Sequence, residues 1–252
     1  MKSAVLAASL LLAPIGGLHA ELTSVRYTFD SENNSAGVWV PGPGSWTTTH
    51  VGANLFVGED WSASKYISYN TPGAGFGGTA WIANAAGTAS LDSQFSLEFS
   101  LYSNTYWGTL AGFGNAAFGG ISVGWASING CTLQLGSTVL GNVAYAFTAN
   151  SWYDLRLDVD LAANSGEGSA SVFVRPTGNA AWIAVTNLSD VDLNLTQRGV
   201  DPSTWNTLWF HEEGAGCGVD NVSLTVIPEP TTWSLLAAGG LLLLARPRHR
   251  KL

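Results

Sequence analysis

The most constraining feature of this sequence is a strict alternation of apolar and polar side chains through its middle. In SWYDLRLDVDL, residues 151–161, every second residue from Tyr153 onward is apolar, and the four residues between them are three aspartates and one arginine. A strand points successive side chains to opposite faces. One face of this segment must therefore be buried and the other must contact water, which predicts a β-strand covering a core on one side.

The same period of two recurs along the body of the chain. It is clear in QFSLEFSL, residues 94–101, and in DNVSLTV, residues 220–226. Shorter segments of this kind are SVRYTF, GISVGWAS, SASVFVR, AAWIAVT and TLWFHEE, separated by runs rich in Asn, Ser, Gly and Pro. No segment of the body has a sustained period of 3.6 residues. Eight or more one-sided strands need a second layer, so residues 21–226 are predicted to be an all-β, two-sheet antiparallel sandwich or jelly roll.

The first 20 residues are typical of a secretory signal peptide. Lys2 supplies one positive charge, an apolar stretch follows over residues 4–12, and Pro14 then interrupts it before the small residue Ala20. This order predicts an N-terminal signal helix that signal peptidase removes after Ala20, so we expect export. The alternative is a buried N-terminal helix of the fold.

The end of the chain combines three features in a fixed order. Ile227 and the motif Pro228-Glu229-Pro230 come first, and two prolines one residue apart favour an extended, exposed segment. Residues 231–245 then carry no charge, which predicts a short transmembrane helix. Basic residues beside such a segment stay in the cytoplasm, so the body is expected outside. The alternative is a core helix of the domain. The basic residues are Arg246, Arg248, Arg250 and Lys251.

This order of motif, apolar helix and basic end resembles the PEP-CTERM sorting signal that exosortases recognise. The resemblance covers residues 227–252: the motif at 227–230, the apolar helix at 231–245 and the basic tail at 246–251. It implies a Gram-negative bacterium that makes exopolysaccharide. It also implies a transient stop in the inner membrane, removal of the tail by an exosortase, and delivery to the cell surface or extracellular matrix.

Without these two ends, the body is strongly acidic. The whole chain has 10 basic and 18 acidic residues and a net charge of −8. Removing Lys2 and the four basic tail residues leaves five cations against 18 acids, a net charge of −13. Such a charge disfavours nucleic acid and anionic membrane surfaces as partners and favours solubility and cation binding. The five cations are Arg26, Lys65, Arg156, Arg175 and Arg198.

The two cysteines, Cys131 and Cys217, both lie in the part that we expect to be exported. An oxidising compartment permits a disulfide, so we predict a bridge between them. The alternative is a pair of unpaired buried thiols. A catalytic thiol is not expected, because Gly216-Cys217-Gly218 has no evident histidine and base partner.

Acidic residues near both ends of the body predict a structural calcium site. Asp30 and Glu32 follow the first expected strand, and Asp220 and Asn221 begin the last. Ca²⁺ prefers clustered carboxylate and carbonyl oxygens, and pairing of the two terminal strands would bring these residues together. The alternative is that they cap turns. No other cofactor is expected, because the segment around His211 lacks the helical spacing of a zinc site.

Three tryptophans form a candidate sugar-stacking rim. Trp39, Trp46 and Trp61 lie in or beside a Gly- and Pro-rich region, residues 37–60, that lacks clean alternation. Exposed aromatic rings can stack on the faces of sugars. The alternative is that these side chains belong to the core, where most tryptophans of a sandwich lie.

Two carboxylates on one strand face suggest the hypothesis of a catalytic pair. Asp158 and Asp160 are two residues apart, which places their carboxylates roughly 6 to 7 Å apart, a spacing that glycosidases use. The alternative is a solvated strand face on which Arg156 pairs with its acidic neighbours.

The segment 151–185 resembles the back half of a concanavalin A-like or laminin G-like sandwich, in which a Trp-led strand turns into a second strand. It departs from that pattern at Arg175-Pro176, where such modules commonly have Asp-Gly. No Glu-x-Asp-x-x-Glu run, Ser-His-Asp layout or metal motif is present. We therefore expect a non-enzymatic surface or matrix protein, associated with exopolysaccharide or biofilm, that binds glycan or serves as a spacer. The competing hypothesis is a secreted glycan-active hydrolase.

Overall fold

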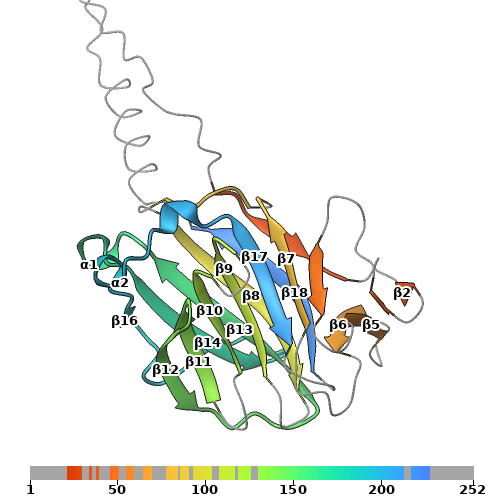
Figure 1. Cartoon of the computed structure of the whole chain (residues 1–252). Helices are drawn as coiled ribbons and strands as arrows, with labels where there is room; N and C mark the ends of the chain where they lie inside the picture. Colours follow the sequence, from red (N-terminus) through yellow and green to blue (C-terminus); the bar gives the residue numbers. More distant parts are fainter. Residues whose placement is uncertain are drawn as a thin grey trace, which may run out of the picture.

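The structure, a computed structural model, describes residues 22–29, 34–35, 38–39, 46–50, 55–59, 65–69, 78–84, 86–90, 93–103, 108–116, 119–125, 130–212 and 217–227. Within these ranges the chain forms two antiparallel sheets that pack face to face, as Figure 1 shows. This confirms the predicted all-β sandwich. The expected signal peptide, the Pro-Glu-Pro motif and the basic tail lie outside the described residues. In the described ranges no helix has the length and apolar character needed to cross a membrane.

The first sheet has nine strands, and its centre is the alternating segment identified in the sequence. Its order is β15 (Ile183–Ala184), β14 (Ser169–Pro176), β13 (Ser151–Asp160), β8 (Gln94–Ser103), β18 (Gly218–Val226), β6 (Lys65–Tyr69) and β5 (Leu55–Glu59). Two short strands also join it: β1 (Val25–Tyr27) pairs with β18, and β16 (Val191–Asp192) pairs with β14. β13 pairs along its whole length with β8, so these two strands carry the middle of the sheet.

The second sheet has seven strands and packs against the apolar face of the first. Its order is β12 (Thr138–Ala144), β11 (Gly130–Leu135), β10 (Ile121–Trp125), β9 (Thr109–Gly114), β17 (Thr207–Glu212), β7 (Gly78–Ala83) and β4 (Thr47–His50). A separate small pair consists of β2 (Asn34–Ser35) and β3 (Val38–Trp39). In Figure 1, β11 and β12 lie at one end of the molecule, and β5 and β6 lie at the other.

Short helical turns connect some of the later strands. They are α1 (Ala163–Gly166), α2 (Leu195–Arg198) and the 3-10 turn η1 (Pro202–Thr204). α1 joins β13 to β14, and two of its residues, Asn164 and Ser165, have left-handed backbone angles. It is therefore a tight connection between the strands of a hairpin, as the Asn-Ser-Gly sequence favours.

The core lies where the alternation places it. Leu155, Leu157 and Val159 of β13 are at most 2% exposed, and Phe95 and Leu97 of β8 are fully buried. Burying such a side chain stabilises the fold by about 1.5–3 kcal/mol. The residues between them point outward, so the first sheet has one apolar and one polar face. The second sheet differs, because every residue of β9 and β10 is buried.

The predicted disulfide between Cys131 and Cys217 is not formed, so this prediction was wrong. Both cysteines are buried, and their thiols are not joined. Cys131 lies on β11, which is two strands away from β9, whereas Cys217 directly precedes β18, which packs against β9 and β17 of the other sheet. Strands are spaced by about 4.8 Å and stacked sheets by about 10 Å, whereas a disulfide needs Cα atoms within about 7 Å. Burial instead raises the pKa of the Cys131 thiol to about 12.

Candidate functional site on the outer face of the first sheet

The polar half of the alternation forms the outer face of the first sheet. Antiparallel register aligns the outward residues of neighbouring strands in rows. One row contains Arg175, Asp154 and Ser100, and the next contains Phe173, Arg156, Glu98, Ser223 and Arg26. Three of the five cations of the body therefore lie on this one face, together with several acids.

A groove of about 250 Å³ crosses these rows. It is lined by Arg26, Glu98, Phe99, Ser100, Asp154, Arg175, Thr177, Asn221 and Ser223. All of these except Phe99 have side chains that can donate or accept hydrogen bonds. The groove is thus a polar site. Its lining comes from five strands and from Thr177, which directly follows β14.

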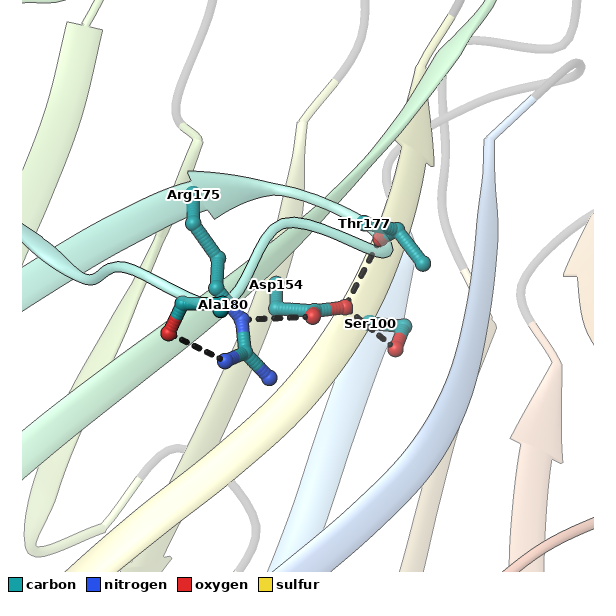
Figure 2. Close-up of polar contacts among 5 residues, drawn as sticks. All are labelled: Ser100, Asp154, Arg175, Thr177 and Ala180. Atoms are coloured by element: carbon teal, nitrogen blue, oxygen red, sulfur yellow. Dashed lines mark hydrogen bonds and ion pairs between the residues drawn. The ribbon is translucent and has the colours of Figure 1, made fainter.

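Asp154 holds one wall of the groove together. Its Oδ1 atom accepts hydrogen bonds from Ser100 Oγ at 2.9 Å and from Thr177 Oγ1 at 2.7 Å. Its Oδ2 atom pairs with Arg175 Nε at 2.9 Å, and Arg175 Nη1 reaches the carbonyl oxygen of Ala180 at 3.5 Å (Figure 2). Both carboxylate oxygens are therefore engaged, which fixes the guanidinium group of Arg175 at the edge of the groove.

An aromatic ring lies over the guanidinium groups beside this wall. The guanidinium carbon of Arg175 lies 4.1 Å from the centroid of the Trp182 ring, and that of Arg156 lies 4.9 Å from it. Arg156 also lies 4.4 Å from the Phe173 ring centroid and pairs through Nε with Asp158 at 3.1 Å. Cation–π contacts of this kind hold a planar ring in a defined place. Trp182 itself is half-buried.

A bulge in β18 builds the opposite wall. The register of β18 shifts between Asp220 and Ser223, and Asn221 takes a left-handed backbone conformation with φ of 52°. The Asp220 carboxylate accepts hydrogen bonds from Asn221 N at 2.6 Å and from Asn221 Nδ2 at 2.9 Å. Arg26 Nη2 donates to Asn221 Oδ1 at 3.0 Å. The bulge thus directs the side-chain amide of Asn221 toward Arg26. The guanidinium group of Arg26 is therefore hydrogen-bonded to a neutral group and not to a carboxylate.

Glu98 lies on the central strand between the two walls. It is half-buried, and its carboxylate makes no hydrogen bond to any residue in the described ranges. Burial raises the pKa of Glu98, because a desolvated carboxylate is harder to ionise. Arg156 and Arg175 oppose this rise, and Asp158 and Asp154 add to it. The groove therefore presents an acceptor that no side chain of the described ranges uses.

The predicted calcium residues are placed only in part. Asp30 and Glu32 lie outside the described residues, whereas Asp220 and Asn221 lie side by side in the bulge of β18. Asp220 is 7% exposed, and its carboxylate is occupied by Asn221. In the described part of the chain no group of three or more His, Cys, Asp or Glu residues is placed to hold a metal. The four-residue calcium site stays a prediction.

The predicted tryptophan rim was wrong for Trp46. This residue is 6% exposed and packs against Phe29 and Phe210, with ring centroids 6.0 and 5.2 Å away, and against Tyr27 at 5.2 Å. It belongs to the core, because its ring contacts aromatic side chains of both sheets, Tyr27 of β1 and Phe210 of β17. Trp61 and the side chain of Trp39 lie outside the described residues.

The sequence did not identify Trp182 as a site residue. The alternation predicts a one-sided strand over residues 180–186, and only two residues of that segment, Ile183 and Ala184, form one. The available signal was its position just after the turn that follows Arg175. The contact with Arg156 depends on the register in which β13 pairs with β14, which the sequence does not specify.

Asp158 and Asp160 have structural roles of their own. Asp158 accepts a hydrogen bond from Ser96 Oγ at 2.5 Å and pairs with Arg156. Asp160 accepts a hydrogen bond from Gln94 Nε2 at 3.0 Å and two more from backbone N–H groups of the turn that follows. Neither residue lines the groove. Their contacts match the alternative reading of a solvated strand face.

No protein-family model matches the chain, and no curated protein matches it. Solved structures that it resembles include the globular domain of T. cruzi calreticulin, with 10% identity, a TM-score of 0.49 and coverage of 88% of this chain and 94% of that one. Another is the exoplasmic/lumenal domain of VIP36 in a Ca²⁺/Man3GlcNAc-bound form, with 11% identity, a TM-score of 0.45 and coverage of 75% and 87%. A third is the binding domain of botulinum neurotoxin serotype C1, with 11% identity, a TM-score of 0.43 and coverage of 82% and 51%, so the chain spans about half of that structure.

Proposed function

We propose that this protein is an exported surface or matrix protein whose sandwich binds a glycan in the groove on the outer face of the first sheet. The observation that carries the proposal is the half-buried ring of Trp182, which two arginines hold beside that groove. A sugar ring has an apolar face of C–H groups and a rim of hydroxyl groups. An aromatic plane next to convergent polar side chains complements both.

The polar lining supports the same proposal. Arg26 and Arg175 donate N–H groups, the Glu98 carboxylate accepts, and Ser223 can do both. Sugar hydroxyls donate and accept from the same atom, so they can satisfy a lining of mixed character. Hydrogen bonds to charged groups are the stronger ones, which favours specific binding over loose adsorption.

Delivery to the surface is the second part of the proposal, and the sequence of the two ends supports it. Signal peptidase is proposed to cut after Ala20, and an exosortase to act at Pro228-Glu229-Pro230 after a transient stop in the inner membrane. Intact mass of the protein from its native host tests this. A mass that fits residues 21 to about 230, found outside the inner membrane, is expected. A protein that retains residues 231–252 in the inner membrane would contradict the processing step.

We also propose that the protein is not an enzyme. The absence of catalytic motifs in the sequence supports this, and so do the structural contacts of Asp158 and Asp160. Hydrolysis of the polysaccharide by the purified chain, lost in Asp158→Asn protein, would overturn it.

Glycan binding is tested by titrating the full-length chain with exopolysaccharide from its host. Trp182→Ala should weaken binding about five- to thirtyfold, because a stacked ring contributes on the order of 1–2 kcal/mol. Ile183→Ala is the matched control, since Ile183 is the next residue, is 51% exposed and does not line the groove. Equal affinity of wild type and Trp182→Ala, or no binding by the wild type, would contradict the proposal.

A further inference from the structure

The groove has no excess of positive charge around it, and the body as a whole is strongly acidic. Arg26, Arg156 and Arg175 share this face with at least five acids, which are Glu98, Asp154, Asp158, Asp160 and Asp220. The two other cations of the body are Lys65 and Arg198, and the chain has 18 acids in all. An anionic polymer would therefore meet a repelling surface on its approach and no excess of positive charge at the groove. A neutral ligand meets neither obstacle.

Of the four charged residues that line the groove, Arg175 and Asp154 pair with each other and two remain available. Arg175 pairs with Asp154 at 2.9 Å, and Arg156 pairs with Asp158 at 3.1 Å. The remaining cation, Arg26, is bound to the neutral amide of Asn221. The remaining acid is Glu98, whose carboxylate makes no hydrogen bond within the described ranges.

These two groups stand opposite each other across the groove. Arg26 is paired with Ser223, and Ser223 is paired with Glu98, so the two lie in one row with a single strand between them. Two strand spacings separate their backbones by about 10 Å. Ser223 between them is small, so a pyranose ring placed over it would have a donor on one side and an acceptor on the other.

We infer that the groove takes a neutral glycan, one sugar of which donates a hydroxyl to the Glu98 carboxylate and accepts a hydrogen bond from Arg26. This rests on the proposed glycan binding and names its ligand class and its two polar anchors. It also implies a pH response. The ionised Glu98 carboxylate is a stronger acceptor for a hydroxyl group than the protonated carboxyl, so affinity falls as pH drops through the raised pKa of Glu98.

Other charged groups face Glu98 and could influence how the affinity depends on pH. Arg156, Asp158 and Asp154 belong to β13, Arg175 to β14 and Arg26 to β1. The arginines stay charged throughout, so they do not alter the sign of the effect. Asp154 and Asp158 are still present in Glu98→Gln protein. Any pH dependence of affinity that comes from these two aspartates therefore remains in this variant, and the part that disappears belongs to Glu98.

The first experiment compares three ligands with the full-length wild-type chain: a neutral glucan or mannan, a polyuronate, and the same polyuronate after reduction of its carboxyl groups. We expect binding to the neutral polymer and to the reduced polymer, and at least about tenfold weaker binding to the polyuronate. Tighter binding of the polyuronate would overturn the inference and leave glycan binding in place. Binding to none of these polymers or to the host exopolysaccharide would remove the proposed function itself.

The second experiment measures affinity for the neutral polymer from pH 7.5 down to pH 4. Wild-type affinity should fall up to about tenfold per pH unit below the pKa of Glu98, whereas Glu98→Gln should bind more weakly at pH 7.5 and lose most of this slope. Glu167→Gln is the matched control, because Glu167 contacts Thr196 N at 2.9 Å, away from the groove. An unchanged slope in Glu98→Gln would overturn the assignment.

A measurement on the wild type alone covers the case in which the variant does not fold. Carboxyl NMR titration of Glu98 should show that saturating neutral glycan lowers its pKa, because the ligand binds the ionised form. An unchanged or higher pKa in the complex would overturn the role given to Glu98.

Discussion

At the scale of single residues, one glycine explains how the second sheet is buried on its outer face. A Cβ atom at Gly112 would lie 2.5 Å from two ring carbons of Trp209 and 2.8 Å from the carbonyl oxygen of Ile121. Trp209 is 1% exposed, and its Nε1 atom donates to the Gly119 carbonyl at 3.1 Å. The ring can therefore lie flat over β9 only because residue 112 has no side chain.

Gly112→Ala is predicted to destabilise the protein by about 1–3 kcal/mol, the usual cost of forcing an extra methyl group into a packed site. Urea unfolding followed by circular dichroism measures the change. The same change in a Trp209→Ala background serves as the control, because the ring that the new Cβ would meet is then absent. Equal losses in the two backgrounds would show that Trp209 is not held against residue 112.

His211, on the same face of the second sheet, makes stability depend on pH. Burial lowers its pKa from 6.5 to about 4, and its Nδ1 atom lies 2.9 Å from Thr79 Oγ1. The unfolded chain therefore takes up a proton at a pH where the folded protein does not. This stabilisation is present in full above pH 6.5 and is lost as pH falls toward about 4.

The predicted loss on moving from pH 7 to pH 4.5 is about 2–3 kcal/mol from this group alone. It is measured as the difference in unfolding free energy between wild type and His211→Asn at each pH. Glu98 contributes with the opposite sign, because its pKa is raised, but it is present in both proteins and cancels. A constant difference between the two proteins across this range would contradict the buried, neutral histidine.

At the scale of elements, strands differ in how much of the core they carry. β13 lies between β8 and β14, and Leu157 at its centre is fully buried. β12 is an edge strand of the second sheet, and its Val139 is 54% exposed. Leu157→Ala should cost about 2–5 kcal/mol and Val139→Ala less than about 0.5 kcal/mol. Similar midpoints of thermal unfolding for the two variants would contradict this assignment of centre and edge.

The elements also show how far alternation alone predicts the fold. β8, β13 and β18 were predicted with the correct faces, because each has one buried and one solvated side. β9 was not, since glycine and tryptophan bury it on both sides and erase the period of two. Alternation also does not say which sheet a strand joins. For that reason the pairing of Cys131 with Cys217 was predicted wrongly.

The candidate site was predictable only in its outline. The outward aspartates of β13 follow from the sequence pattern, but the partners of Asp154 do not. Ser100 and Thr177 lie 54 and 23 residues away along the chain, and only the register of three strands brings them to one carboxylate. The same register, not a local motif, places Arg26 across from Glu98.

At the scale of the whole molecule, the distribution of charge distinguishes the groove from the rest of the surface. A body with a net charge of −13 gathers three of its five cations on one face of one sheet. Each of these three arginines shares its row of outward residues with an acid: Arg175 with Asp154, and Arg156 and Arg26 with Glu98. A sandwich that served only as a spacer would not need this arrangement, whereas a site that orients a polar, uncharged ligand does.

The most direct measurement is a crystal structure of the protein with a neutral oligosaccharide that it binds. Electron density for one sugar ring is predicted in the groove, beside Trp182, with hydroxyl groups within hydrogen-bond distance of Glu98 and Arg26. A ligand bound on the outer face of the second sheet, with the groove unoccupied, would contradict the account. It would show that the arginines and acids of the first sheet serve only to keep its outer face soluble.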